Sequence, residues 1–254
     1  MIFDTHTHYD DRKFEEDRDK LLSSLKESNI TKIVNVGADI ETTKQTLALA
    51  AAYDFIYAAV GVHPSDVDCL NEENYAWLKR QTSCKKVVAV GEIGLDYYWE
   101  KDPQKQQQQK YWFQRQLSLA KETNLPVVIH SRDAAEDTLN ILKEQPDISG
   151  VIHCFSYSKE LALEYVKMGY YIGVGGVITF KNAKKLKEAV EAIPLERIVI
   201  ETDCPYLAPE PYRGKRNESI YLPYVLNEIA RIKHMTPAEI EDVTFHNAEK
   251  LYCI

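Results

Sequence analysis

The chain begins with MIFDTHTHYD, in which a short apolar run leads directly into two histidines separated by one residue. Side chains of an extended strand alternate between two faces, so His6 and His8 are expected to project the same way. Two imidazoles on one face could hold a metal ion together, but a polar loop could carry the same residues by chance. The pair alone leaves both interpretations open.

Polar residues of the same kind follow several other apolar runs. Five of the seven histidines stand where such a run ends, whereas His234 and His246 lie in C-terminal sequence with helical spacing and are expected to be structural. Chance placement would scatter these residues over helices and loops. The residues that follow apolar runs are His6, His8, His63, Glu92, His130, His153 and Asp203.

The apolar runs are typical of buried parallel strands, because they are nearly continuous rather than alternating. Segments with helical spacing lie between them, and these include 14–29, 104–124 and 131–146, the last with Ser131 or Asp133 as its expected N-cap. The eight apolar runs expected to form strands are residues 1–4, 32–37, 55–63, 86–92, 125–130, 149–153, 170–176 and 197–203.

This alternation predicts an α/β protein with a single (β/α)8 TIM-type barrel, formed by residues 1–254 as one domain. No linker rich in Gly, Pro or Ser interrupts it. An open, doubly wound sheet is the alternative, but eight evenly spaced units fit a closed barrel better. In such a barrel the C-terminal ends of the strands converge on one site, so the polar residues above are expected to meet there.

The composition is that of a soluble globular protein, with 44% hydrophobic and 28% charged residues. No apolar run approaches the roughly 20 residues of a membrane span, and the start is too polar for a signal peptide. Five scattered cysteines without a C-x-x-C motif indicate reduced thiols and a cytoplasmic location. The net charge of -8 argues against a broad basic surface for nucleic acid, but not against one small positive site.

A metal centre explains these strand ends best, because a buried charged residue is costly unless it is paired or bound to metal. Imidazole and carboxylate ligands without thiolate suit Zn²⁺, Mn²⁺, Ni²⁺, Fe²⁺ or, less well, Mg²⁺. Six ligands are too many for one catalytic ion with an open position, so two divalent ions are expected, with Glu92 between them. The expected metal ligands are His6, His8, Glu92, His130, His153 and Asp203.

Neighbouring residues have other expected roles. His63, in GVHP, is expected to contact substrate, since the ligand set is already full. Glu201 shares the face of Asp203 and could orient a ligand or serve the packing alone. Cys154 and Cys204 follow ligands directly, but strand alternation is expected to turn both toward the covering helices as inert thiols.

Six segments together resemble the TatD family of metal-dependent hydrolases, within the amidohydrolase-like superfamily. They are DTHTHYD, GVHP, GEIGLDYY, PVVIHSRDA, HCFSYS and ETDCPYLAPEPYRGKRNES, and the similarity runs from residue 1 to the final helix. The resemblance implies a TIM-type barrel, a divalent-metal site and deoxyribonuclease activity, often 3′-to-5′ exonuclease. It also implies that the six residues named above are the metal ligands.

The expected reaction is therefore hydrolysis of a phosphodiester by a metal-activated water. Asp203 is the expected proton acceptor, with Glu92 as its catalytic partner. Two dications and the two ligand carboxylates leave a local charge of about +2 (4 − 2), which would attract an anion into an acidic protein. The expected substrate-binding residues are His63, Arg132, Arg213, Lys215 and Arg216, and Tyr97, Tyr98 and Trp99 could either stack on a terminal base or seal the barrel.

The expected partner is DNA, single-stranded or at its 3′ ends, as substrate, with no membrane and no obligate protein partner. Two other functions remain open. One is hydrolysis of an ester or amide by the same metals, for example by an aminoacyl-tRNA deacylase. The other is a metal-dependent binding scaffold without catalysis.

Overall fold

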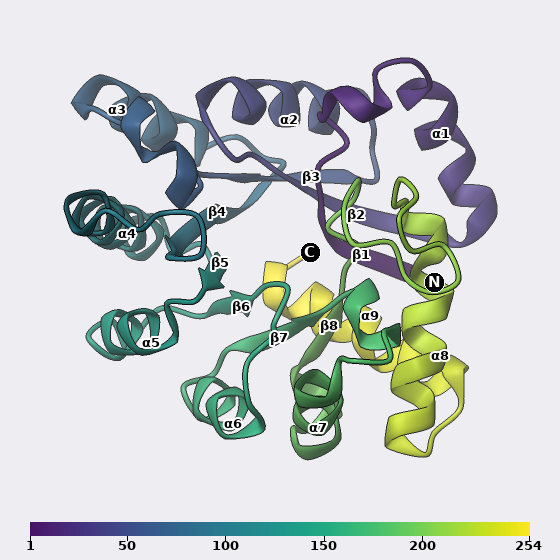
Figure 1. Cartoon of the computed structure of the whole chain (residues 1–254). Helices are drawn as coiled ribbons and strands as arrows, with labels where there is room; N and C mark the ends of the chain where they lie inside the picture. The colour runs from purple at the N-terminus through teal and green to yellow at the C-terminus, as the bar shows by residue number, and fades with distance from the viewer.

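The eight expected strands form one parallel sheet in sequential order in the computed structural model, which describes residues 1–254. Figure 1 shows the strands around a centre with helices outside them, which confirms the (β/α)8 barrel. The sequential order excludes a doubly wound sheet, which reverses its order at a switch point. The strands are β1 (Ile2–Thr7), β2 (Ile30–Val36), β3 (Ile56–Val60), β4 (Val87–Asp96), β5 (Val127–Arg132), β6 (Gly150–Ile152), β7 (Tyr171–Val174) and β8 (Ile198–Ile200).

The helices lie between successive strands, except that two follow β8. No helix combines the length and the apolar character that crossing a bilayer requires. The α-helices are α1 (Arg18–Ser24), α2 (Ile40–Ala52), α3 (Glu72–Gln81), α4 (Pro103–Thr123), α5 (Ala135–Lys143), α6 (Lys159–Lys167), α7 (Lys184–Ala192), α8 (Leu222–Lys233) and α9 (Pro237–Tyr252). Short 3-10 helices are η1 (Arg12–Phe14), η2 (Leu25–Ser28), η3 (Pro64–Cys69), η4 (Gly176–Thr179), η5 (Leu195–Arg197) and η6 (Ser219–Tyr221).

The expected helix over 104–124 agrees with α4, which Asp102 caps by accepting from the Gln104 N–H. The helix expected over 14–29 is instead divided into η1, α1 and η2. The expected cap of the helix over 131–146 was wrong: Ala134 occupies the N-cap of α5 without a side-chain hydrogen bond. Asp133 has φ of 54° and lies before the cap, so the chain turns there rather than starting a helix.

Side chains rather than a long ladder close the barrel between β1 and β8. One isolated bridge joins Thr7 to Cys204. Deeper in the barrel, the buried Asp4 carboxylate accepts the Thr202 N–H at 3.0 Å and the Thr202 hydroxyl at 2.7 Å. The Ser219 hydroxyl donates to the same carboxylate at 2.6 Å. Asp4 therefore fastens the first strand to the segment that follows the last one.

The interior of the barrel is packed at the end opposite the expected site. Inward residues of the strands, such as Phe3 and Val128, form one apolar cluster with Phe245, Leu251 and Tyr252 of α9. Figure 1 shows α9, in yellow, lying across the ring of strands. The Tyr252 hydroxyl donates to the buried Thr5 carbonyl at 3.0 Å. Helix α9 thus closes one end, and the expected site lies at the other, where the strands have their C-terminal ends.

Gly94 allows β4 and β5 to approach each other. It is paired with His130 and has φ of +145°, which side-chain-bearing residues rarely adopt. A Cβ at this position would overlap the carbonyl oxygen of His130. The approach places Glu92 and His130, on these two strands, within reach of each other.

Gly94→Ala should destabilise the fold by about 3 kcal/mol, because overpacking adds to an unfavourable φ. Chemical denaturation of both proteins measures the difference in the free energy of unfolding. Gly214→Ala is the matched control: its φ is also positive, +85°, but nothing lies within 4 Å of the added Cβ. Its expected cost is about 1 kcal/mol, and equal losses for the two variants would contradict the close approach of β4 and β5.

Candidate metal centre

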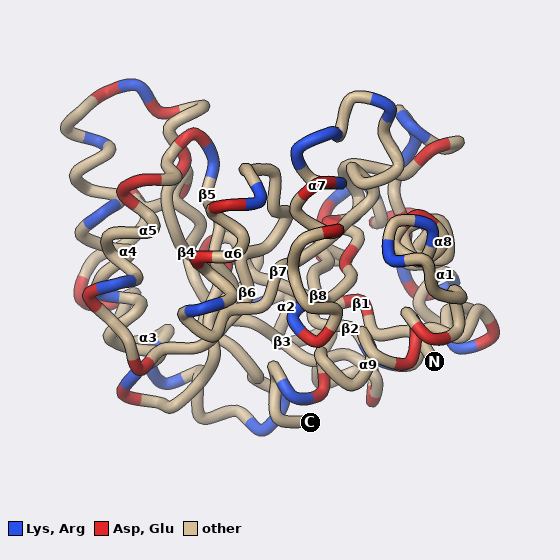
Figure 2. Tube along the Cα trace, turned by 90° about the horizontal axis from the view of Figure 1, so that it is seen from below, with Lys and Arg blue, Asp and Glu red and all other residues tan.

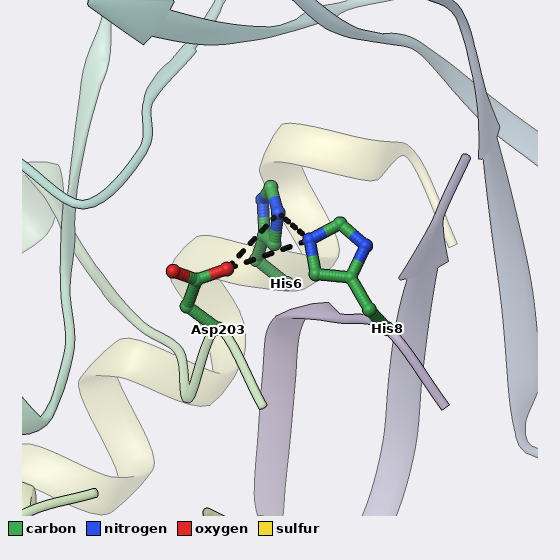
Figure 3. A group of neighbouring side chains, drawn as sticks. All are labelled: His6, His8 and Asp203. Atoms are coloured by element: carbon green, nitrogen blue, oxygen red, sulfur yellow. Dashed lines mark hydrogen bonds and ion pairs between the residues drawn. The ribbon is translucent and has the colours of Figure 1, made fainter. Parts of the chain in front are cut away.

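His6 and His8 share one side of β1 and its continuation, as strand alternation predicts. Their Nε2 atoms lie 3.1 Å apart, and Figure 3 shows both rings beside the Asp203 carboxylate. Asp203 Oδ1 lies 3.8 Å from His6 Nε2 and 3.4 Å from His8 Nε2. The His8 Nδ1–H donates to the Val36 carbonyl at 2.9 Å, which leaves the Nε2 lone pair facing the group. These three side chains could hold one cation together.

Glu92 lies between two groups of histidines and presents one oxygen to each. The sequence predicted that Glu92 would end its strand, but β4 continues to Asp96 and Glu92 lies inside it. Its Oε2 is 3.5 Å from His6 Nε2 and 3.8 Å from His8 Nε2. Its Oε1 is 2.7 Å from His130 Nδ1 and 2.9 Å from His153 Nε2. The carboxylate therefore connects the ends of β1, β5 and β6.

His130 has a carboxylate at each ring nitrogen. Besides the Glu92 contact at Nδ1, its Nε2 lies 3.1 Å from Oδ2 of Asp96, the buried last residue of β4. Burial lowers the pKa of His130, but the contacts with Asp96 and Glu92 outweigh it and raise this pKa. Sequence reasoning missed Asp96. Its even spacing from Glu92 in one strand was the available signal, hidden because the strand was expected to end at Glu92.

His153 follows β6 and stacks on His6, with ring centroids 3.9 Å apart. Its Nδ1 lies 3.4 Å from Oε1 of Glu201, a fully buried residue that follows β8. Gly173 of β7 makes room for this carboxylate, since a Cβ there would lie 2.5 Å from Glu201 Oε2. Glu201 is thus placed to orient His153, one of the two roles expected for it.

The two cysteines that follow candidate ligands have different surroundings. Cys204 is buried, as expected. Cys154 has φ of 45°, so the strand alternation expected to turn it toward the helices does not apply there. Burial raises the pKa of the Cys154 thiol, and Asp203 and Glu201 raise it further while His153 opposes them. The thiol therefore stays protonated, which agrees with an inert role.

The buried carboxylates of this cluster have only histidines as ionic partners. No Lys or Arg lies within 4 Å of Glu92, Asp96, Glu201 or Asp203. Burial raises the pKa of Glu92, but the charge of His153 and hydrogen bonds from His130 and His153 outweigh it and hold this pKa well below its usual range. Buried anions are costly without a counter-charge. A bound cation would therefore stabilise this cluster of carboxylates.

A divalent cation fits this donor set. Buried nitrogen and oxygen atoms remain without hydrogen-bond partners there, namely His6 Nδ1, His153 Nδ1 and Glu201 Oε2. Burial and the charge of His153 lower the pKa of His6, which favours the neutral imidazole that binds metal. Three groups of side chains are close enough to share an ion: His6 belongs to two of them, and the third contains His63, Glu92 and His130.

His63 lies near the cluster, but its tautomer differs from that of His8, whose proton is on Nδ1. Its Nε2 lies 3.7 Å from Glu92 Oε1, and its ring meets His130 edge-on at 4.3 Å. Burial, and then the charge of His130, lower the pKa of His63 to about 3. The neutral ring accepts the Ser65 N–H at Nδ1, 3.1 Å away. The proton therefore sits on Nε2, which faces the site as a donor rather than as a metal ligand.

The four basic residues expected to bind substrate have different partners. Arg216 is engaged by Asp17 and Glu218, at 2.7 and 2.8 Å, so its charge is already neutralised. Arg213 and Lys215 are exposed and have no carboxylate within 4 Å, although Arg213 lies 4.4 Å from the Phe180 ring. Figure 2 shows basic segments in loops at the end of the barrel away from the C-terminus.

Arg132, the last residue of β5, is also exposed and has no ionic partner. Its guanidinium lies 3.9 Å from the centroid of the Tyr98 ring. The two remaining histidines lie at the end of α8 and on α9 and not in the cluster, as expected. His234 ends α8 in a left-handed conformation, and His246 is exposed on α9, where it donates to the Asp242 carbonyl.

Protein freed of metal by a chelator should bind Mn²⁺ or Zn²⁺, and Glu201→Gln should lower that affinity about 10- to 100-fold. Glutamine keeps an acceptor for the Cys154 N–H, which Glu201 Oε1 now accepts at 2.6 Å, but it removes the charge that orients His153. Isothermal titration calorimetry measures both affinities. Glu241→Gln, at the far end of the chain on α9, is the control. Equal affinities for all three proteins would contradict the proposed contact.

Known proteins that are similar to this chain include metal-dependent hydrolases. The profile of the family "TatD related DNase" matches residues 3–253. YabD of Bacillus subtilis, an uncharacterized metal-dependent hydrolase, is 47% identical over the full length of both chains. The uncharacterized metal-dependent hydrolase TatD of Mycobacterium tuberculosis is 34% identical, covering 99% of this chain and 97% of its own. The crystal structure of the TatD homologue YJJV from Escherichia coli has a TM-score of 0.94 at 32% identity, covering 100% of this chain and 98% of its own. With the barrel and its histidine and carboxylate cluster, these matches show that the chain belongs to the TatD family of metal-dependent hydrolases.

Proposed function

We propose that the chain is a deoxyribonuclease that hydrolyses phosphodiester bonds of single-stranded DNA from the 3′ end, with two divalent ions. The observation that carries this proposal is the placement of Glu92, whose two oxygens face two separate groups of histidines. A carboxylate in this position can bridge two cations, the arrangement that phosphodiester hydrolysis uses to stabilise both the attacking and the leaving oxygen. The family description, TatD related DNase, supports the same substrate.

The proposed ligands divide between the two oxygens of Glu92. His6, His8 and Asp203 lie on the side of Oε2. His130 and His153 lie on the side of Oε1. When bound, the ions would supply positive charge that polarises the phosphodiester and lowers the pKa of a nearby water toward neutrality.

Asp203 is the proposed proton acceptor. Figure 3 shows one of its oxygens toward His6 and His8 and the other directed away from both rings. The side chain is 17% exposed, so a water can reach the outer oxygen. In the proposed reaction this oxygen accepts the proton of the attacking water and later passes it to the leaving 3′ oxygen. We assign to the His63 Nε2–H, which lies near Glu92, the role of donor to a phosphate oxygen.

Asp96 and Glu201 change the charge expected for the site. Two dications with Glu92 and Asp203 alone would leave about +2, but the buried Asp96 and Glu201 raise the number of carboxylates to four and bring the sum to about zero (4 − 4). Attraction of a polyanion then depends on free cations at the mouth. We assign this role to Arg132, Arg213 and Lys215, and we assign Arg216 to holding its loop through Asp17 and Glu218.

The protein should shorten single-stranded DNA from the 3′ end in Mn²⁺ or Mg²⁺, and Asp203→Asn should lower kcat about 10²- to 10⁴-fold because it cannot accept a proton. Gel analysis of an oligonucleotide labelled at the 5′ end resolves the products. His246→Ala, an exposed histidine on α9, is the control and should match the wild type. Absence of cleavage with metal demonstrably bound, together with turnover of a neutral cyclic amide, would favour the amide hydrolase interpretation instead.

Replacing both Arg213 and Lys215 with alanine should raise KM for the oligonucleotide about 10-fold. It should also reduce the dependence of log KM on log salt by about 1.4, as expected for two lost contacts to single-stranded phosphates. Steady-state kinetics at several salt concentrations measure both changes. Arg216→Ala should instead leave the salt dependence unchanged and lower the melting temperature, since its charge is held by Asp17 and Glu218. A reduced salt dependence in the Arg216 variant alone would overturn the division of roles.

A further inference from the structure

Two aromatic side chains stand exposed at the mouth of the barrel, directly after β4. Trp99 is 69% exposed and Tyr98 is 45% exposed. The two rings meet edge-on, with centroids 4.8 Å apart. The other tryptophans are covered, since Trp112 is buried and Trp77 is partly buried. An exposed tryptophan beside a functional site commonly marks a binding surface, because it offers a large rigid apolar face.

A single buried carboxylate ties this aromatic pair to the metal centre. Asp96 Oδ1 accepts the backbone N–H groups of Tyr98 and Trp99 at 2.9 and 3.0 Å. Its Oδ2 contacts His130 at 3.1 Å. The Asp96 N–H in turn donates to Gln109 of α4, which is buried. The backbone that carries the rings is therefore fixed relative to the proposed reaction site.

A free cation lies against the same surface. The Arg132 guanidinium is 3.9 Å from the Tyr98 ring centroid and 5.6 Å from that of Trp99. Arg132 is paired with Asp96 across β4 and β5, two residues beyond His130. It makes no ion pair, so its charge is available to a ligand phosphate while its plane packs on the rings.

A small cavity of about 170 Å³ borders Trp99. Pro64 and Val67 of η3 form one wall, Trp99 another, and Gln109 also lines it. His63 directly precedes the first wall, and Asp96 holds the backbone of the second. The cavity thus lies between two segments that both lead into the metal centre.

We propose that Trp99, with Tyr98 and Arg132, forms a stacking subsite for the nucleobase next to the cleaved phosphodiester bond. This inference rests on the proposed nuclease function and adds the recognition of an unpaired base. Stacking on an aromatic face tolerates any base but requires the base to be out of a duplex. The subsite therefore selects single-stranded ends without reading their sequence, and Arg132 holds the phosphate of the stacked nucleotide.

Kinetics with two substrates test the subsite. Trp99→Ala should lower kcat/KM for a single-stranded oligonucleotide about 10-fold or more, mainly through KM, and Trp99→Phe should restore most of it. An oligonucleotide whose 3′-terminal residue lacks its base should be a poorer substrate for the wild type by a similar factor. Trp99→Ala should show no further loss on that substrate, because the interaction is already absent. Tyr111→Ala is the matched control, an exposed aromatic on α4 that also lies near an arginine, Arg115.

Cleavage by the wild type with no effect of Trp99→Ala or of the missing base overturns the subsite and leaves the nuclease proposal standing. A second measurement is independent of cleavage. Titration of metal-loaded protein with dAMP should quench tryptophan fluorescence, and Trp99→Phe should remove that quenching. Quenching without DNA cleavage supports the base subsite and contradicts the nuclease, whereas unchanged fluorescence contradicts the subsite.

Discussion

The bonds that Asp4 makes across the junction of β1 and β8 hold the site together. The one bridge at this junction joins Thr7 of β1 to Cys204, beyond β8, and the Asp4 contacts to Thr202 and Ser219 add to it. Strand β1 carries His6, and β8 leads into Asp203, whose N–H donates to the His6 carbonyl at 3.0 Å. If the two strands separated, the histidines and the aspartate that face one another would separate as well. The geometry of the candidate metal centre therefore depends on Asp4, a buried carboxylate to which no role in substrate binding is assigned.

Accumulated negative charge governs the chemistry of the site. Four carboxylates converge where the strands end, and imidazoles are their only ionic partners. Such an arrangement is unfavourable by itself and becomes favourable when cations enter, so the energy of metal binding and the energy of folding are linked. Because these carboxylates would offset the charge of the proposed ions, binding of the proposed DNA substrate would depend on basic residues at the rim. Arg132, Arg213 and Lys215 are unpaired there, in a protein that is acidic as a whole.

Much of this arrangement could be predicted from the sequence, because parallel strands in sequential order bring their C-terminal ends to one place. The histidine spacing at 6 and 8 and the eight apolar runs sufficed for the barrel and the cluster. Asp96 was missed because Gly91 and Gly94 hide the continuation of β4 beyond Glu92. The partners of Arg216 could not be foreseen, since Asp17 lies 199 residues away in the chain. Local patterns identify elements, whereas such pairings depend on tertiary structure.

Helix α9 closes one end of the barrel. Phe245, Leu251 and Tyr252 pack against the inward side chains of the strands, so no passage runs along the axis. If the protein is the proposed nuclease, a DNA strand that enters the barrel cannot pass through it, so each released nucleotide must leave on the side where the strand entered. Binding of the substrate strand and release of the product therefore take place at the same end of the barrel. Under this proposal, turnover on a long DNA strand requires the released nucleotide to leave before the shortened end can advance.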